Sequence, residues 1–230
     1  LLAYFVDPIK NLIGLQPMLQ TAIVAAERLS EILELESEFK EDEDKNLAPS
    51  LKGDIEIEGL NFRYGTRQLV LRDINLKIRS GEKIAIVGES GSGKTTLAKL
   101  LLGFYDYESG EIRINGYNLK DISKRHLREK IAYISQDIFL FSGTIFENLV
   151  LGNRNLKMED VIEISRLTTL DEFVSKFPLR YNTMIEENGA NLSGGQKQLI
   201  AITRALLKKP EIVIMDEATS NLDSVTEQAI

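Results

Sequence analysis

Residues 83–96 read Lys83-Ile-Ala-Ile-Val-Gly-Glu-Ser-Gly-Ser-Gly-Lys-Thr-Thr96 and form the most informative run in this chain of 230 residues. The run begins with a short, mostly apolar segment, Lys83–Val87, that suits a strand buried on both faces of a sheet. A helical apolar pattern follows at residues 97–102. The loop between them matches G-x-x-x-x-G-K-[ST], so the order of strand, loop and helix predicts a phosphate-binding site.

The residue types in this loop suit the phosphates of a nucleotide. Its glycines let the backbone turn tightly and point N–H groups at phosphate oxygens, and the helix start adds partial positive charge. Lys94 is expected to reach the β- and γ-phosphates and to stabilise charge during catalysis, while the Thr95 hydroxyl ligates Mg²⁺. The alternative is a turn without a ligand, and the flanking strand and helix count against it. The expected nucleotide contacts are Gly88, Glu89, Ser90, Gly91, Ser92, Gly93, Lys94, Thr95 and Thr96.

A second apolar run, Ile212-Val-Ile-Met215, ends in the two carboxylates Asp216 and Glu217. Beside a phosphate loop, the first carboxylate is expected to lie next to the Mg²⁺ ion of the nucleotide. Glu217 is the candidate base that polarises the attacking water. Because many strands end in acidic residues, this pattern gains its meaning only in combination with the phosphate loop.

A second glycine-rich helix start occurs at Leu192-Ser-Gly-Gly-Gln196, before the helical run 197–209. A helix N-terminus of this kind is another anion-binding element. One chain does not need two such elements for one triphosphate. We therefore expect Ser193, Gly194, Gly195 and Gln196 to contact the γ-phosphate of a nucleotide held by a second subunit.

These motifs together resemble the nucleotide-binding domain of an ABC transporter, and the resemblance runs through essentially all of residues 51–230. It implies that Tyr64 stacks on adenine, and that Gln136 contacts Mg²⁺ and senses the membrane domain. It also implies that Ser220-Asn-Leu-Asp223 couples two ATP sites, with Asp223 as the acidic member. Taken without the family, Tyr64 and Gln136 are ordinary surface residues.

The resemblance implies an α/β fold with a P-loop NTPase core and a mainly parallel sheet. An antiparallel β subdomain, an α-helical signature subdomain and a preceding N-terminal helical segment complete this fold. The implied cofactors are ATP and Mg²⁺, and the implied reaction is ATP hydrolysis coupled to export. The implied partners are a second nucleotide-binding domain, most simply in a homodimer, and a transmembrane domain that contacts Gln136 and residues 139–146. The implied location is the cytoplasmic face of the cell membrane.

Two features depart from the family pattern. The segment Glu186-Glu-Asn-Gly189 matches the family's Gly-Glu pair only at Glu187. The family also has a switch histidine some thirty residues after the catalytic glutamate, whereas this sequence reaches residue 230. His126 lies before Gln136, at an expected exposed helix end, and receives no catalytic role. We therefore expect a chain cut at both ends, with weak or absent ATPase activity by itself.

Charge divides the chain at about residue 50. The net charge is −7, from 28 basic and 35 acidic residues, and residues 1–50 hold ten of the acids but only four of the bases. The absence of a basic excess argues against a nucleic-acid partner. The chain has no cysteine, which excludes disulfides and thiolate metal sites. Residues 36–50 are accordingly expected to form an acidic linker before the ATP-binding domain, 51–230.

Residues 1–35 are predicted to be helical, with interruptions near Pro8, Gly14 and Pro17. The longest uncharged stretch, residues 11–26, is too short and too polar to predict a membrane span unaided. The open alternatives are a helix packed on a protein surface and a bilayer segment. By resemblance, the segment is the end of the last transmembrane helix and its cytoplasmic extension. An apolar stripe at helical spacing comprises Leu15, Leu19, Ala22, Ala26, Leu29 and Leu33.

Asp7-Pro8, Leu15-Gln16 and the 220–223 loop are similar to peptidase-containing ABC exporters of bacteriocins and related peptides. Two other classes share the nucleotide motifs. One is a soluble ABC-type ATPase that acts on ribosomes or DNA, which usually has paired cassettes or a long coiled-coil insertion. The other is a module that binds nucleotide without turnover. The apolar residues 1–26 favour the exporter.

Overall fold

The structure is a computed structural model that describes residues 3–35, 37–38, 47–153 and 155–216, with side chains from residue 14 onward. The chain forms two compact units, residues 1–44 and 45–230.

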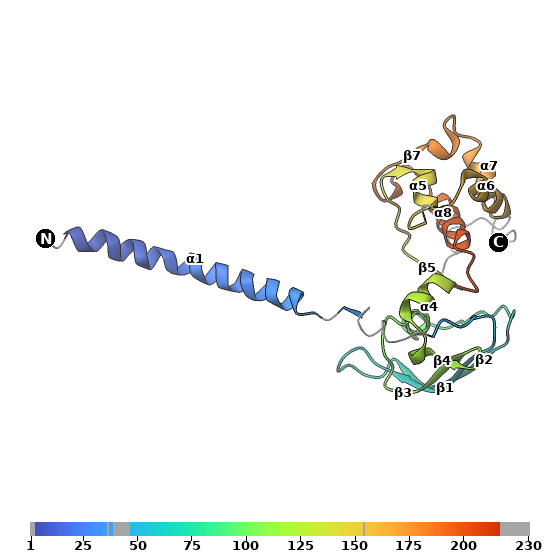
Figure 1. The fold of residues 1–230 in the computed structure, drawn as a ribbon, viewed down its shortest axis with the longest axis horizontal. Coiled ribbons are helices and arrows are strands. Elements are labelled where there is room, and N and C mark those ends of the chain that lie inside the picture. Colours follow the sequence, from blue (N-terminus) through green and yellow to red (C-terminus); the bar gives the residue numbers. More distant parts are fainter. Residues whose placement is uncertain (1–2, 36, 39–46, 154, 217–230) are drawn as a thin grey trace. The chain divides into compact units, whose positions relative to one another are not determined.

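The long helix α1 (Ala3–Leu33) makes up most of the described part of the first unit, and Figure 1 shows it as one uninterrupted ribbon. The interruptions expected near Pro8, Gly14 and Pro17 are therefore wrong. A proline inside a helix removes one hydrogen bond and kinks the helix more readily than it ends it when good helix formers lie on both sides. The Thr21 hydroxyl donates to the Pro17 carbonyl across one turn, at 2.9 Å. Among the described residues, no helix combines the length and the apolar composition needed to cross a bilayer.

The second unit begins with an antiparallel sheet in the order β2-β1-β3-β4. Its strands are β1 (Ile55–Phe62), β2 (Leu71–Ile78), β3 (Ser109–Ile114) and β4 (Tyr117–Asn118). Ile55, Ile57, Leu60 and Phe62 of β1 are buried, and the alternation shifts around Gly59, where the pairing register also shifts. Two helices, α3 (Lys94–Leu101) and α4 (Lys124–Lys130), contribute leucines to the same hydrophobic core.

A second hydrophobic core lies among helices α5 (Ile145–Leu149), α6 (Met158–Leu167), α7 (Leu170–Val174) and α8 (Gly194–Leu207). The short strands β6 (Gly143–Thr144) and β7 (Met184–Ile185) pair beside them, and Figure 1 shows these helices gathered into one group. The described residues also contain 3-10 turns at η1 (Leu119–Asp121), η2 (Arg180–Asn182) and η3 (Glu187–Gly189). The α/β class, the antiparallel β subdomain and the helical subdomain are thus confirmed.

Parallel pairing within the described residues joins β5 (Ile131–Ile134) to β8 (Ile212–Met215). The strand expected over residues 83–87 is wrong, because this segment has no regular structure here. Its apolar side chains are exposed, with Ile84 at 42%, Ile86 at 47% and Val87 at 88%. A strand buried on both faces needs hydrogen-bonded neighbours, and no described strand pairs with this one.

Candidate nucleotide-binding site

The phosphate loop opens onto helix α3 through Gly93, whose left-handed backbone has φ 95° and ψ 8°. A Cβ atom at this position would lie 2.7 Å from Cδ2 of Leu71, so both the conformation and the space require glycine. Within the described residues, no side chain caps the first turn of α3. Its N–H groups are therefore open to an anionic ligand, as a phosphate site requires.

Lys94 lies over this loop. Its Nζ donates to the carbonyl oxygens of Gly88 and Glu89, at 2.8 and 2.9 Å. The neighbouring Thr95 is exposed, whereas Thr96 is buried against the core. The expected loop residues 88–96 thus form one continuous, largely exposed surface at the start of α3, with the ammonium group drawn toward its centre.

Tyr64 is brought to the same helix although it lies thirty residues earlier. Its hydroxyl is 3.1 Å from Oγ1 of Thr96, and its ring is half-buried. The ring meets Phe62 and Tyr105 edge-to-face, with centroids 4.8 and 5.1 Å apart. Tyr105 was not predicted from the sequence, because nothing in its spacing marks it. The result is an aromatic cluster beside the phosphate loop, suited to a flat base.

Asp216 follows β8 directly and accepts a hydrogen bond from the hydroxyl of Tyr133, at 3.0 Å. Burial raises the pKa of Tyr133 to about 12, and the adjacent Asp216 carboxylate adds to the shift. Tyr133 is another partner that the sequence analysis did not predict. Within the described part of the chain, no hydrogen bond or ion pair joins Asp216 to Lys94 or Thr95.

Gln136 is exposed just after β5. Glu217 and Asp223 lie outside the described residues, so the structure places neither. No described group of three or more acidic or histidine side chains is arranged to hold a metal ion. Mg²⁺ usually keeps several waters and binds one or two carboxylates together with phosphate oxygens. The donor set of Thr95, Gln136 and Asp216 fits that mode, in which the nucleotide supplies the remaining ligands.

Ser193 begins helix α8 with a complete capping box. Its hydroxyl accepts from the Gln196 N–H at 3.3 Å, while the Gln196 side-chain oxygen accepts from the Ser193 N–H at 2.9 Å. Gly194 and Gly195 are the first two residues of the helix. Among the described residues, no hydrogen bond connects Ser193 or Gln196 to the phosphate loop.

The two remaining sequence expectations concern His126 and Glu187. His126 is half-buried in α4, and its Nε2 lies 2.7 Å from the Pro49 carbonyl, so the expectation of an exposed helix end is wrong. The ring holds the segment before β1, which fits a structural role. Glu187 is exposed and begins η3, and the next carbonyl, that of Asn188, accepts from Lys197 Nζ of α8 at 2.8 Å.

Comparison with known proteins agrees with this geometry. Residues 71–220 match the family model described as "ABC transporter". The chain is 46% identical over 231 residues to the transport/processing ATP-binding protein ComA of Streptococcus pneumoniae strain R6. It is 46% identical over 233 residues to the pediocin PA-1 transport/processing ATP-binding protein PedD of Pediococcus acidilactici. Each match covers all of this chain and 32% of the relative. The chain belongs to the ABC transporter family, as an ATP-binding domain.

A solved structure supports the same conclusion. The structure of a bacterial Atm1-family ABC exporter with ATP bound matches with a TM-score of 0.82 and 31% sequence identity. The match covers the whole of this chain and 40% of that chain. The chain thus spans about a third of the curated relatives it matches, and it resembles the ATP-binding part of an exporter that has been seen with its nucleotide.

Proposed function

We propose that this chain binds and hydrolyses ATP, with Mg²⁺, to drive export of a peptide such as a bacteriocin. The observation that carries this proposal is the uncapped start of α3, where Gly93 and Lys94 present open N–H groups and an ammonium group to an anion. The names of the relatives support a peptide substrate, because both are called transport/processing proteins and one is named for the transport of pediocin PA-1.

Each residue of the site has a proposed part in turnover. Tyr64 stacks on adenine, and loop 88–96 holds the phosphates. Mg²⁺, which supplies charge neutralisation when it is bound, is held by Thr95, Gln136 and Asp216. Glu217 polarises the attacking water, and Lys94 stabilises the charge that develops on the γ-phosphate.

We propose further that the ATP site is completed by a second nucleotide-binding domain. The exposed segment Ser193–Gln196 of one copy contacts the γ-phosphate bound to loop 88–96 of the other, and Asp223 couples the two sites. The Ser193 hydroxyl supports this assignment, because it accepts the cap bond from Gln196 and keeps its own proton to donate. A homodimer is the simplest such arrangement.

A transmembrane domain is the other proposed partner, which places this chain at the cytoplasmic face of the membrane. The contact surface includes Gln136 and residues 139–146. Phe139 and Phe141 support it, because they are 55% and 48% exposed and their rings meet edge-to-face at 4.9 Å. Residues 1–35 continue the last transmembrane helix, residues 36–50 form the linker and residues 51–230 are the ATP-binding domain.

The test uses the full-length transporter in liposomes. Mg²⁺-dependent ATP hydrolysis is expected, and Glu217→Gln should abolish it while ATP binding persists. The matched control is Lys94→Met, which should lose binding as well as hydrolysis. Unchanged turnover in the Glu217→Gln protein would remove Glu217 from the role of base, and no nucleotide binding by the unmodified protein would overturn the proposed function.

A further inference from the structure

Arg204 makes a link that none of the assigned motifs uses. It lies in the last turn of α8, and its Nη1 and Nη2 atoms are both 3.3 Å from the carbonyl oxygen of Phe139. Burial lowers the pKa of the guanidinium, which is half-buried. Within the described residues it forms no ion pair, and its hydrogen-bond acceptor is the Phe139 carbonyl.

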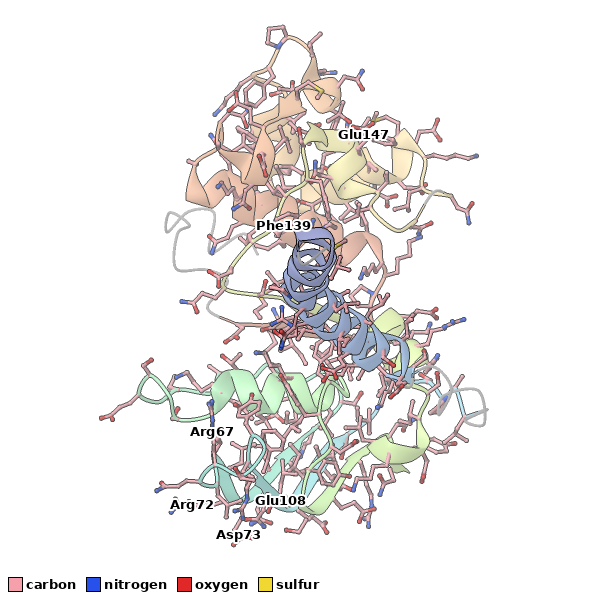
Figure 2. The ribbon with its side chains drawn as sticks, turned by 90° about the vertical axis from the view of Figure 1, so that its left-hand side faces the viewer. Arg67, Arg72, Asp73, Glu108, Phe139 and Glu147 are labelled. Atoms are coloured by element: carbon pink, nitrogen blue, oxygen red, sulfur yellow. The ribbon has the colours of Figure 1, made fainter. Side chains whose placement is uncertain are left out.

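The two ends of this link belong to two parts of the proposed ATP site. Helix α8 begins directly after Ser193, and eleven residues at 1.5 Å each separate that residue from Arg204, about 16 Å along one rigid element. Phe139, labelled in Figure 2, follows Gln136 by three residues. The guanidinium therefore ties the helix of the signature segment to the segment that carries Gln136.

A cavity of about 150 Å³ adjoins Arg204 between β5 and α8. The two elements pack beside it through a small hydrophobic core of Ala132, Ile134, Ala201, Ile202 and Ala205. The cavity lining includes Ala132, Ile134, Ile138, Leu151, Ala201 and Ala205. In this region the two hydrogen bonds of Arg204 are the directional contact between α8 and the Phe139 segment.

We propose that Arg204 is a positioning residue that makes the Gln136 segment and the signature helix move together during ATP turnover. The inference rests on the proposed function, because it assumes that nucleotide binding draws Gln136 toward Mg²⁺ and that a second copy's phosphate draws Ser193. A rigid link between the two segments holds both in place around the phosphates, and catalysis depends steeply on such positioning.

The experiment measures kcat and KM for ATP in the full-length transporter in liposomes. Arg204→Ala should lower kcat by up to about 100-fold, the cost of misplacing reacting groups by about 1 Å, and change KM and ATP affinity less than about twofold. Arg204→Lys keeps the charge but not the planar pair of donors, and should recover part of kcat. It also serves as the test variant should the alanine protein not fold.

Thr203→Val is the matched control, since Thr203 is the preceding residue of the same helix. Its buried hydroxyl bonds to the Leu199 carbonyl and to Thr168, at 2.7 and 2.6 Å, and has no contact with Phe139. The valine variant should lower the melting temperature while kcat stays within about twofold. If Thr203→Val lowers kcat as much as Arg204→Ala, Arg204 only stabilises the fold and the proposal is overturned.

A double-mutant cycle with Gln136→Ala completes the test. If Arg204 acts through the Gln136 segment, adding Arg204→Ala to Gln136→Ala should lower kcat no further. Independent, multiplicative losses would contradict the proposal. Failure of the proposed function itself is distinguishable, because the unmodified transporter would then show no ATP turnover before any variant is compared.

Discussion

The phosphate loop and the signature segment are both glycine-rich and both lead into a helix, yet the N-termini of the two helices differ in how they are capped. The start of α3 has a left-handed glycine as its cap and no side-chain cap bond. The start of α8 has a complete Ser193–Gln196 capping box. The first helix leaves the N–H groups of its first turn for a ligand, whereas in the second the Ser193 hydroxyl already accepts the Gln196 N–H and still has its own proton to donate. The comparison indicates that loop 88–96 is the primary anion site and Ser193–Gln196 the accessory one.

Removing the ammonium group of the primary site should have the largest effect. Lys94→Met is expected to lower ATP turnover by at least about 100-fold, because the charge beside the γ-phosphate is lost. Nucleotide binding and hydrolysis by the full-length transporter measure this. Lys197→Met is the matched control in the accessory region. A smaller loss for Lys94→Met than for the control would reverse the ranking of the two sites.

Replacing a glycine by alanine should affect stability differently at the starts of α3 and α8. Gly93→Ala should cost about 1–3 kcal/mol, because an alanine must adopt the left-handed conformation and its Cβ would press on Leu71. Gly194 is a helical residue of α8 without a positive φ, so Gly194→Ala should leave thermal unfolding of the chain unchanged or slightly improved. Equal melting temperatures for the two variants would contradict the distinction between the helix starts.

Ser193→Ala tests whether a side-chain cap stabilises the start of α8. Loss of the cap should destabilise the chain by about 1 kcal/mol, since the Gln196 N–H loses its acceptor. Ser92→Ala, in the loop that has no side-chain cap, should leave stability unchanged. Chemical denaturation of both variants checks this. A cost at Ser92 that matches the cost at Ser193 would mean that α3 is also capped by its own loop.

The smallest effect is expected at Glu211, which lies in neither helix start. Burial alone would raise its pKa, but hydrogen bonds from the Leu51 N–H and Ser50 and the Lys130 ion pair outweigh burial and hold the pKa below its ordinary value. A carboxylate whose pKa is lower in the folded state stabilises the fold at pH values above the unfolded-state pKa. This stabilisation is lost as pH falls through the folded-state pKa. Glu211→Gln should therefore melt earlier than the unmodified chain near neutral pH.

That difference should shrink as pH falls below the unfolded-state pKa and vanish once the carboxylate is protonated in the folded state too. Melting temperatures across the acid range provide the check, and nucleotide binding at neutral pH should be the same in both proteins. A stability difference that persists unchanged to about pH 3 would show that the charge of Glu211 is not its source.

The sequence predicts the helix starts better than the sheet. The helix starts after loop 88–96 and after Ser193 depend on neighbours within a few residues, so the local sequence reveals them. Strand pairing depends on partners far along the chain, and the apolar run 83–87 therefore predicted a strand that the described residues do not pair. Tyr105 and Tyr133 escaped prediction for the same reason, because only the fold brings them to Tyr64 and Asp216.

Mixed dimers test most directly whether each ATP lies between loop 88–96 of one copy and Ser193–Gln196 of another. In a Glu217→Gln background that retains bound ATP, one dimer combines a Lys94→Met copy with a Ser193→Phe copy. A second dimer combines a copy bearing both changes with a copy bearing neither. The retained ATP is counted in each.

A site shared between copies predicts one ATP in the first dimer, because both changes fall in the same site and the other site is intact. It predicts no retained ATP in the second dimer, where each site has one damaged half. The reverse result, with ATP retained only in the second dimer, would show that both segments act on the same chain's nucleotide and would contradict the account.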